Sequence, residues 1–382
     1  MKKIIGIVAE YNPFHEGHVY HIQETKRKLG EDAAVICVMS GDFVQRGEWA
    51  IQPKSLRAQN ACRGGADLVI ELPLPWCLAS AGYFANGAVA ILKALRITHL
   101  SFGSESGDLD RLMKISERLS ENSFKNEIRH FLKQNPNMSY PSAREAVLGA
   151  SLPVQPNDLL ALEYLQALKD SSVQPLAVKR IGKHHDERGE GSILSASEIR
   201  SRILLGTVCA PHIDPEKIDL ACVSRLRMLK REEFDLLPDC RDGLSQRIYD
   251  AVREHSTVES ICLAAKTKRY TLSRIRRSVW CASLGLRDRL TQIDPPYARV
   301  LAMNQRGREL LSSVKKTCPI PVLTQPKEVL KLEQNVQKIF QLGSDAHDLF
   351  MLCYPVKWND RCGEDYRNGP VIAEREDINC DF

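Results

Sequence analysis

The stretch IIGIVAEYNPFHEGHVYHIQETKRKL, residues 4–29, begins with an apolar, β-branched run and continues through a polar loop into a helical pattern. The run over residues 4–9 predicts a buried strand, and residues 18–29 predict a helix. The loop between them holds His15 and His18, separated by a glutamate and a glycine. Because a helix that follows a strand offers free backbone N–H groups and a positive dipole end, this turn favours phosphate.

Short apolar runs recur through the first half of the chain and alternate with helical patterns. They cover residues 33–39, 67–72, 97–102 and 173–181. Such alternation predicts an α/β fold with a doubly wound, Rossmann-like parallel sheet. In such a sheet the first and fourth strands lie side by side, and ligands bind at their carboxyl ends. Gly103, directly after the fourth run, is therefore expected near the histidine loop, although glycine also commonly ends a strand in a plain turn.

The histidine pair suits the chemistry of nucleotidyl transfer. Imidazoles of His15 and His18 at a helix N-terminus can donate hydrogen bonds to phosphate oxygens, and Gly17 allows a ligand to approach the backbone. In that reaction the protein positions the attacking group and stabilises charge on the phosphates, without a nucleophile of its own. Two surface histidines or half of a metal site are the alternatives. The metalloprotease spacing His-Glu-x-x-His is absent, because His18 comes one residue too early.

A second helix start lies at residues 195–200, which read SASEIR. Ser197 is expected to open this helix, and Arg200 follows three residues later. The hydroxyl groups of Ser195 and Ser197 and the guanidinium group of Arg200 suit a triphosphate, because arginine offers a fork of donors to phosphate oxygens. An ordinary capped helix with a solvated arginine is the alternative interpretation.

The second half of the chain has a different pattern. After residue 206 the β-branched alternation fades, and helical patterns cover residues 245–254, 272–284 and 326–342. We therefore predict two domains, an α/β domain over residues 1–205 and a mostly α-helical domain over residues 206–382.

Basic residues gather in one part of the predicted helical domain. Residues 266–310 hold eleven Lys or Arg and three Asp or Glu, a local excess of eight positive charges. Such an excess predicts a polyanionic partner, and a solvated helix face is the alternative. For an RNA partner, the basic side chains would bind the backbone and the tyrosine would stack on a base. The residues predicted to bind RNA are Lys268, Arg269, Tyr270, Arg274, Arg276 and Arg277.

Composition and cysteine spacing are typical of a globular protein from a reducing compartment. The chain has 382 residues, of which 43% are hydrophobic. Its 12 cysteines include no Cys-x-x-Cys pair, which argues against a disulfide framework and a zinc site. No run approaches the roughly 20 apolar residues of a membrane span. We therefore predict a cytoplasmic protein with free thiols, no metal site and no membrane partner.

Several longer stretches resemble the tRNA(Met) cytidine acetate ligase family. They are GIVAEYNPFH, MSGDFVQRGE, GADLVIELP and FGSE, at residues 6–15, 39–48, 65–73 and 102–105. Residues 193–200 resemble the later Ile-Ser-x-x-x-Ile-Arg segment of nucleotidyltransferases in the superfamily shared with class I aminoacyl-tRNA synthetases. The resemblance is strongest over residues 1–205. Glu16 and Asp42 depart from the family pattern, because asparagine is usual at both positions.

This resemblance implies a nucleotidyltransferase-type sheet and a ligase that uses ATP, with Mg²⁺, to activate acetate. The enzyme would form acetyl-adenylate and transfer the acetyl group to N4 of the wobble cytidine of elongator tRNA(Met). His15, His18 and Arg200 would then be the catalytic residues. The ATP-binding residues would be Ile7, Val8, Ala9, Glu10, Tyr11, Asn12, Pro13, Phe14, His15, Glu16, Gly17, His18, Val19, Tyr20, Gly103, Asn157 and Arg180, together with Ser195 and Ser197.

Two other functions remain open at the level of the sequence. A small-molecule nucleotidyltransferase, or an acetate ligase with a non-RNA acceptor, would share the ATP site but would not need the basic helical region. A non-catalytic RNA-binding protein with a vestigial nucleotide fold is less consistent with the intact His15, His18 and Arg200.

Overall fold

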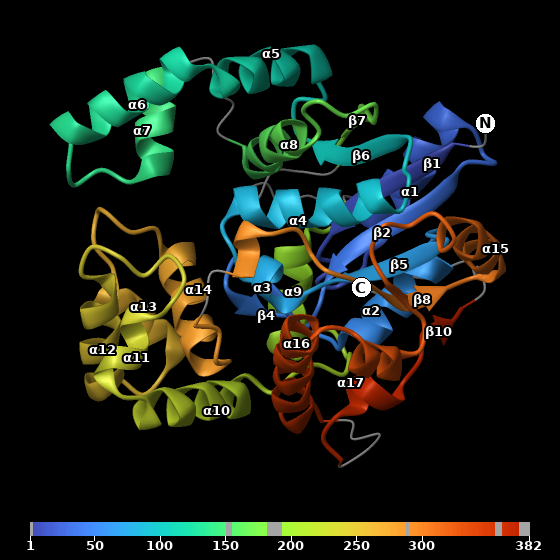
Figure 1. Ribbon diagram of the computed structural model, residues 1–382. Coiled ribbons are helices and arrows are strands. Elements are labelled where there is room, and N and C mark those ends of the chain that lie inside the picture. The colour runs from blue at the N-terminus through green and yellow to red at the C-terminus, as the bar shows by residue number, and fades with distance from the viewer. Residues whose placement is uncertain (1–2, 150–154, 182–192, 288–289, 356–360, 374–382) are drawn as a thin grey trace.

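The computed structural model describes residues 3–149, 155–181, 193–287, 290–355 and 361–373 (Figure 1). Its centre is an eight-stranded sheet, in which five parallel strands follow the order β5-β2-β1-β6-β7. These strands are β1 (Ile4–Ala9), β2 (Ala34–Ser40), β5 (Leu68–Leu72), β6 (His99–Ser104) and β7 (Gln174–Lys179). Because β1 and β6 are neighbours at the point where the strand order reverses, the predicted doubly wound α/β fold is confirmed.

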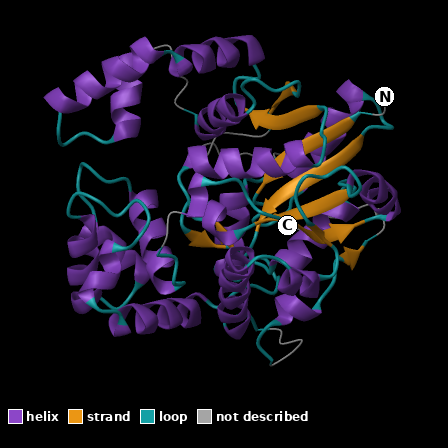
Figure 2. Cartoon of the chain, viewed as in Figure 1, coloured by secondary structure: helices purple, strands orange, loops and turns teal. Residues whose placement is uncertain are grey.

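Both faces of the sheet are covered, which explains the continuous apolar runs in the sequence. All 7 residues of β2 are buried. Val35 and Cys37 pack toward one face, whereas Ile36 and Val38 pack toward the other. Figure 2 shows helices on both sides of the strands. The first face is covered by α1 (Glu16–Leu29) and α2 (Lys54–Arg63), and the second by α4 (Ala81–Ala94), α8 (Pro156–Ala167) and α15 (Gln305–Val314).

The chain returns to the sheet after residue 206, in strands that the prediction of a mostly α-helical region did not include. β8 (Ala298–Met303) pairs antiparallel with β5, while β9 (Val322–Leu323) and β10 (Val371–Ile372) pair parallel with β8. All 6 residues of β8 are buried, but Arg299 interrupts the apolar run that would have marked the strand. The division between residues 205 and 206 stays a prediction, with the addition that segments on both sides of it share one sheet.

A group of five helices is inserted between β7 and β8, and we call it the helical unit (Figure 1). Its members are α10 (Pro215–Met228), α11 (Arg231–Asp235), α12 (Leu244–Glu254), α13 (Val258–Ala265) and α14 (Leu272–Ser283). They share a core that also includes Phe43 and Leu78 from the α/β part. The ring centroids of Phe43 and Trp280 lie 5.0 Å apart, so the helical unit is packed onto the region after β2.

The remaining elements surround these two parts. β3 (Phe43–Val44) and β4 (Glu48–Trp49) form a small antiparallel hairpin. The other helices are α3 (Leu74–Cys77), α5 (Leu109–Ser120), α6 (Asn122–Gln134), α7 (Tyr140–Leu148), α9 (Ala196–Leu204), α16 (Gln334–Leu352) and α17 (Glu364–Arg367), with 3-10 turns at Leu290–Gln292 and Pro326–Lys331. In the part of the chain that the structure describes, no helix combines the length and the apolar character needed to cross a membrane.

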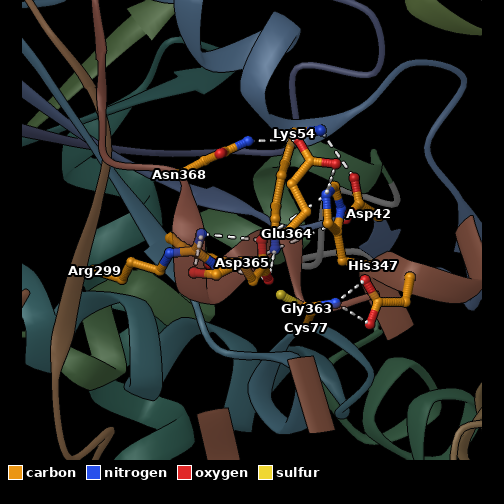
Figure 3. Close-up of polar contacts among 12 residues, drawn as sticks. Asp42, Lys54, Cys77, Arg299, His347, Gly363, Glu364, Asp365 and Asn368 are labelled. Atoms are coloured by element: carbon orange, nitrogen blue, oxygen red, sulfur yellow. Dashed lines mark hydrogen bonds and ion pairs between the residues drawn. The ribbon is translucent and has the colours of Figure 1, made fainter. Parts of the chain in front are cut away.

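A buried ion cluster joins α16 and α17 to the sheet (Figure 3). Lys54 Nζ lies 2.8 Å from Glu71 Oε1 and 2.5 Å from Asp365 Oδ2. Arg299 Nη1 lies 2.9 Å from Glu71 Oε2 and 2.8 Å from Asp365 Oδ2. His347 Nδ1 lies 2.7 Å from Asp42 Oδ2. The cluster, defined here as these six residues, thus pairs three cations with three carboxylates below the protein surface.

The titration behaviour of the cluster follows from this pairing. Burial alone would lower the pKa of His347, but Asp365 and Asp42 outweigh burial and raise it to about 10. Burial alone would raise the pKa of Asp365, but Arg299, Lys54 and His347 hold it well below its usual range. His347 and Asp365 are therefore both charged near pH 7. Arg299 was counted in the basic segment of the sequence, but it lies inside this cluster and cannot face a polyanion.

Candidate active site

His15 and His18 form a reciprocal cap at the start of α1. His15 Nδ1 accepts a hydrogen bond from the Gly17 N–H at 3.0 Å, and His18 Nδ1 accepts one from the His15 N–H at 3.2 Å. The two ring centroids lie 3.9 Å apart. A Cβ atom at residue 17 would lie 2.8 Å from His15 Cε1, so a side chain there would displace the capping ring. The His-x-Gly-His spacing is therefore a requirement of the cap itself.

These hydrogen bonds assign the tautomer of each ring. Because both Nδ1 atoms accept hydrogen bonds, the neutral imidazoles carry their protons on Nε2. Burial, with help from Arg180 and Arg200, lowers the pKa of His15 to about 4. Burial and the neighbouring His15 lower the pKa of His18 well below its usual value. Near pH 7 the pair thus supplies two neutral N–H donors that the cap does not use.

Two arginines from distant segments approach the same turn. The backbone N–H of Arg180, directly after β7, donates to the Ser104 carbonyl at 2.9 Å. The side chain of Arg180 passes over Gly103, where an added Cβ would lie 3.4 Å from Arg180 Cγ. Arg200, on α9, donates from Nη1 to the Asn12 carbonyl at 2.8 Å. The structure therefore brings Gly103, Arg180 and Arg200 to the histidine turn, as expected from the switch point.

A third histidine, His21, lies one helical turn after His18 and was not predicted. Its Nε2 atom is 3.0 Å from Ser101 Oγ on β6, and Ser101 Oγ is 2.7 Å from Thr25 Oγ1. Burial and Arg180 lower the pKa of His21 to about 4. The spacing of three residues from His18 places both rings on one face of α1 and was the available signal.

Asn157 is held in place at the start of α8. Glu105 Oε1 accepts hydrogen bonds from the backbone N–H and the side-chain Nδ2 of Asn157, and Glu105 Oε2 accepts one from the Asp158 N–H at 2.9 Å. In return, Asp158 accepts hydrogen bonds from the Ser104 hydroxyl and the Glu105 N–H. Because Nδ2 of Asn157 donates to Glu105, the Oδ1 atom is the acceptor of this amide group. The sequence analysis selected Asn157 but missed this clamp.

The segment over residues 7–20 has two kinds of side chain. Ile7, Tyr11, Asn12 and Phe14 are at most 4% exposed and pack inside the protein. Asn12 Oδ1, for example, accepts a hydrogen bond from the Ile51 N–H at 2.7 Å. These buried side chains shape the turn. Only the backbone groups of these residues could therefore contact ATP. The partly buried side chains are Val8, Ala9, Glu10, His18, Val19 and Tyr20, and Glu16 is exposed.

The start of α9 lies one residue before the predicted start at Ser197. α9 begins at Ala196, and its N-cap is Ser195, whose Oγ accepts from the Glu198 N–H at 3.2 Å. Ser197 lies in the first turn and is exposed. Because Ser195 and Ser197 are both good capping residues, propensity alone could not separate them.

The predicted RNA-binding residues fall into two groups. Lys268 and Arg269 are exposed. Tyr270 is only 4% exposed, so its ring is not a surface on which a base can stack. Arg276 pairs with Glu48 at 3.0 Å and with Glu259 at 2.7 Å, which occupies its guanidinium group. Tyr270 lies in the turn before α14, where its side chain packs into the core and its hydroxyl donates to the Asp242 carbonyl, and this corrects the expectation of a stacking tyrosine.

Acid is expected to destabilise the protein through His15. The pKa of His15 is about 4 in the folded protein and about 6.5 when the chain is unfolded, so the unfolded state binds more protons between these values. Stability is therefore lost as the pH falls below 6.5, by roughly 2.5 kcal/mol at pH 4.5. Denaturant unfolding at pH 7.0 and 4.5 should show a smaller loss for His15→Asn, which keeps a capping side chain. Equal losses in both proteins would contradict the assignment.

The comparisons with known proteins agree with this geometry. Residues 1–365 match the family described as HIGH Nucleotidyl Transferase. The chain is 35% identical to the tRNA(Met) cytidine acetate ligase of Acetivibrio thermocellus, over 97% of this chain and 100% of the relative. It is 36% identical to that of Thermoanaerobacter sp., over 92% and 95%.

Solved structures are similar over nearly the whole chain. TmcAL of Thermotoga maritima, in its apo form, superimposes with a TM-score of 0.89 at 26% identity, over 97% of this chain and 100% of the other. The same protein bound with alpha-thio ATP superimposes with a TM-score of 0.85 at 27% identity, with the same coverage. The predicted resemblance is confirmed: this chain belongs to the tRNA(Met) cytidine acetate ligase family of HIGH nucleotidyl transferases.

Proposed function

We propose that this protein is an ATP-dependent acetate ligase that acetylates N4 of the wobble cytidine of elongator tRNA(Met). An oxygen of acetate attacks the α-phosphorus of ATP, which forms acetyl-adenylate and releases pyrophosphate. The N4 amine of cytidine then attacks the acetyl carbonyl carbon, so that AMP leaves and the amine loses one proton. The names of the relatives support tRNA(Met) and acetate as substrates, and the alpha-thio ATP complex of TmcAL supports the nucleotide.

The observation that carries the proposal is the pair of neutral imidazoles with Nδ1 occupied and Nε2–H available. Donors fixed in advance stabilise charge that develops on phosphate oxygens without reorganising during the reaction. Arg180 and Arg200 add positive charge at the same turn, which suits the departing pyrophosphate. Acetate supplies the nucleophile, so the protein needs to orient it rather than to attack.

ATP is proposed to bind together with Mg²⁺. Among the described residues, no group of three or more His, Cys, Asp or Glu side chains is placed to hold a metal ion. Mg²⁺ carried by the nucleotide does not need such a group of side chains. It keeps several waters and is usually held by substrate phosphates and one or two carboxylates. Glu16, exposed in the first turn of α1, is a carboxylate directly next to His15 in the described part of the chain. When bound, Mg²⁺ would neutralise charge on the phosphates.

The parts of the chain receive different proposed tasks. The α/β part binds ATP and acetate at the carboxyl ends of β1, β6 and β7, and the helical unit contributes to the tRNA surface. We also propose that the protein works in the cytoplasm, because ATP and tRNA are found there together.

The experiment that tests the function is transfer of labelled acetate to purified tRNA, with and without ATP. We expect ATP-dependent label on elongator tRNA(Met), and none on a transcript whose wobble cytidine is replaced by uridine. Label on both transcripts would contradict the proposal that the wobble cytidine is the acetylated base. Acetate-dependent AMP formation without label on any RNA would support the alternative, an acetate ligase with a non-RNA acceptor.

A further inference from the structure

A cavity of about 230 Å³ lies between the helical unit and the α/β part. Arg241, Arg274 and Arg277 line it from the helical unit, and Ala79 and Tyr83 line it from the α3–α4 region. We call it the arginine pocket. Its volume is below the roughly 300–1,000 Å³ of sites for whole small molecules, so it fits part of a nucleotide rather than a complete cofactor.

The three arginines differ from their neighbour Arg276 in their pairing. Among the described residues, none of the three lies within 4.0 Å of a carboxylate oxygen, whereas Arg276 has two such partners. Arg274 donates from Nε and Nη2 to the Asp239 carbonyl at 2.9 and 2.6 Å, which fixes its guanidinium group without neutralising it. Asp239 is the one carboxylate among the lining residues that the structure describes, so the pocket carries an excess of positive charge. A site of this kind favours an anion.

One residue connects the pocket to the active site. The Gln45 N–H donates to Glu10 Oε1 at 2.9 Å, at the end of β1 just before the histidine turn. The Gln45 carbonyl accepts from Arg277 Nη1 at 3.3 Å, and Gln45 Nε2 donates to the Ala79 carbonyl at 3.3 Å. Gln45 therefore touches both walls of the pocket and the strand that leads to His15. A chain of hydrogen bonds through Gln45 therefore links Arg277 in the pocket wall to Glu10, the residue after β1.

We propose that the arginine pocket binds a backbone phosphate of the RNA substrate, from a nucleotide close to the reacting cytidine. This inference rests on the proposed function and names the contact that positions its RNA. Arginine forks suit phosphate oxygens, and phosphate contacts fix the register of a nucleic acid without reading its sequence. The ring of Tyr83, which is 39% exposed on the facing wall, is available to stack on a base or ribose of the same nucleotide.

The triphosphate of ATP is the other source of phosphate, and separate measurements of the two half-reactions distinguish it from RNA. The test variant is Arg241→Gln, because Arg241 is exposed and has no role in packing the core. We expect acetate-dependent ATP–pyrophosphate exchange, measured without RNA, to stay within twofold of wild type. The Kd for elongator tRNA(Met) should rise about tenfold, as expected for loss of a charged phosphate contact. The slope of log Kd against log salt concentration should fall by about 1.

The matched control is Arg225→Gln, on α10 of the same helical unit. Arg225 is also exposed and lies outside the pocket. An equal loss of tRNA affinity in both variants would overturn the pocket in favour of a diffuse basic surface. A loss of exchange in Arg241→Gln would assign the pocket to ATP. If wild type binds tRNA but transfers no acetyl group, the proposed function fails while the binding comparison still decides the pocket.

Discussion

Replacing His18 with alanine is expected to slow acetate-dependent ATP–pyrophosphate exchange by about 100- to 1,000-fold, the usual cost of removing one fixed donor from a site of developing charge. His18 Nδ1 is held by the His15 N–H at 3.2 Å, so the proton on Nε2 points from a ring that cannot easily turn. Alanine removes this donor and also frees the His15 N–H at the start of α1. Initial rates at saturating ATP and acetate measure the effect on the chemical step.

The control is His130→Ala, because His130 is exposed on α6 and belongs to a part of the chain distant in sequence from the site. Its exchange rate should equal that of wild type. The ring of His18 also packs on Tyr11 at 4.7 Å and on Phe14 at 5.5 Å, so the thermal unfolding of the alanine variant is measured in parallel. Exchange within twofold of wild type, from a folded variant, would remove His18 from the catalytic residues.

The sequence predicted the first βα unit well because its signals were local. β1 covers the predicted residues 4–9, and α1 starts two residues before the predicted helix. The approach of Gly103 to the histidine turn was also predictable, because the rule for parallel sheets supplies the contact between strands one and four. The only long-range information that this prediction needs is the order of the strands in the sheet. A regular alternation of strands and helices largely determines that order.

Features assembled from unrelated segments were not predictable in the same way. The arginine pocket combines Arg241, from a loop, with two arginines of α14 and with Tyr83 of α4, and no spacing links these positions. Tyr270 was predicted to be a surface residue because its sequence neighbours are basic, but its side chain is buried in the core. β8 was missed because Arg299 interrupts its apolar run, and the carboxylates that pair with Arg299, Glu71 and Asp365, lie elsewhere in the chain. In each case the decisive contact lies outside the local sequence window.

The ion cluster is the clearest case of a contact that local pattern does not reveal, and breaking it should have the largest effect on stability. Asp365→Ala is expected to reduce the free energy of unfolding by about 3–5 kcal/mol, the typical loss when one partner of a buried ion pair is removed. The substitution removes the carboxylate that lies closest to both Lys54 and Arg299. Glu71, together with Asp42 at 3.9 Å from Lys54, is then left to pair with these buried cations. Urea unfolding at pH 7 measures the loss, with one slope of unfolding free energy against urea concentration used for wild type and variant.

An exposed carboxylate on the neighbouring helix provides the matched control. Asp345→Ala, on α16, should change the free energy of unfolding by less than about 0.5 kcal/mol, as is usual for surface positions. A double-mutant cycle then separates pairing from packing. Because Asp365 Oδ1 lies 3.9 Å from His347 Nε2, removing both charges with Asp365→Ala and His347→Leu should cost less than the sum of the single losses. Additive losses would mean that packing, rather than charge pairing, anchors α16 and α17 to the sheet.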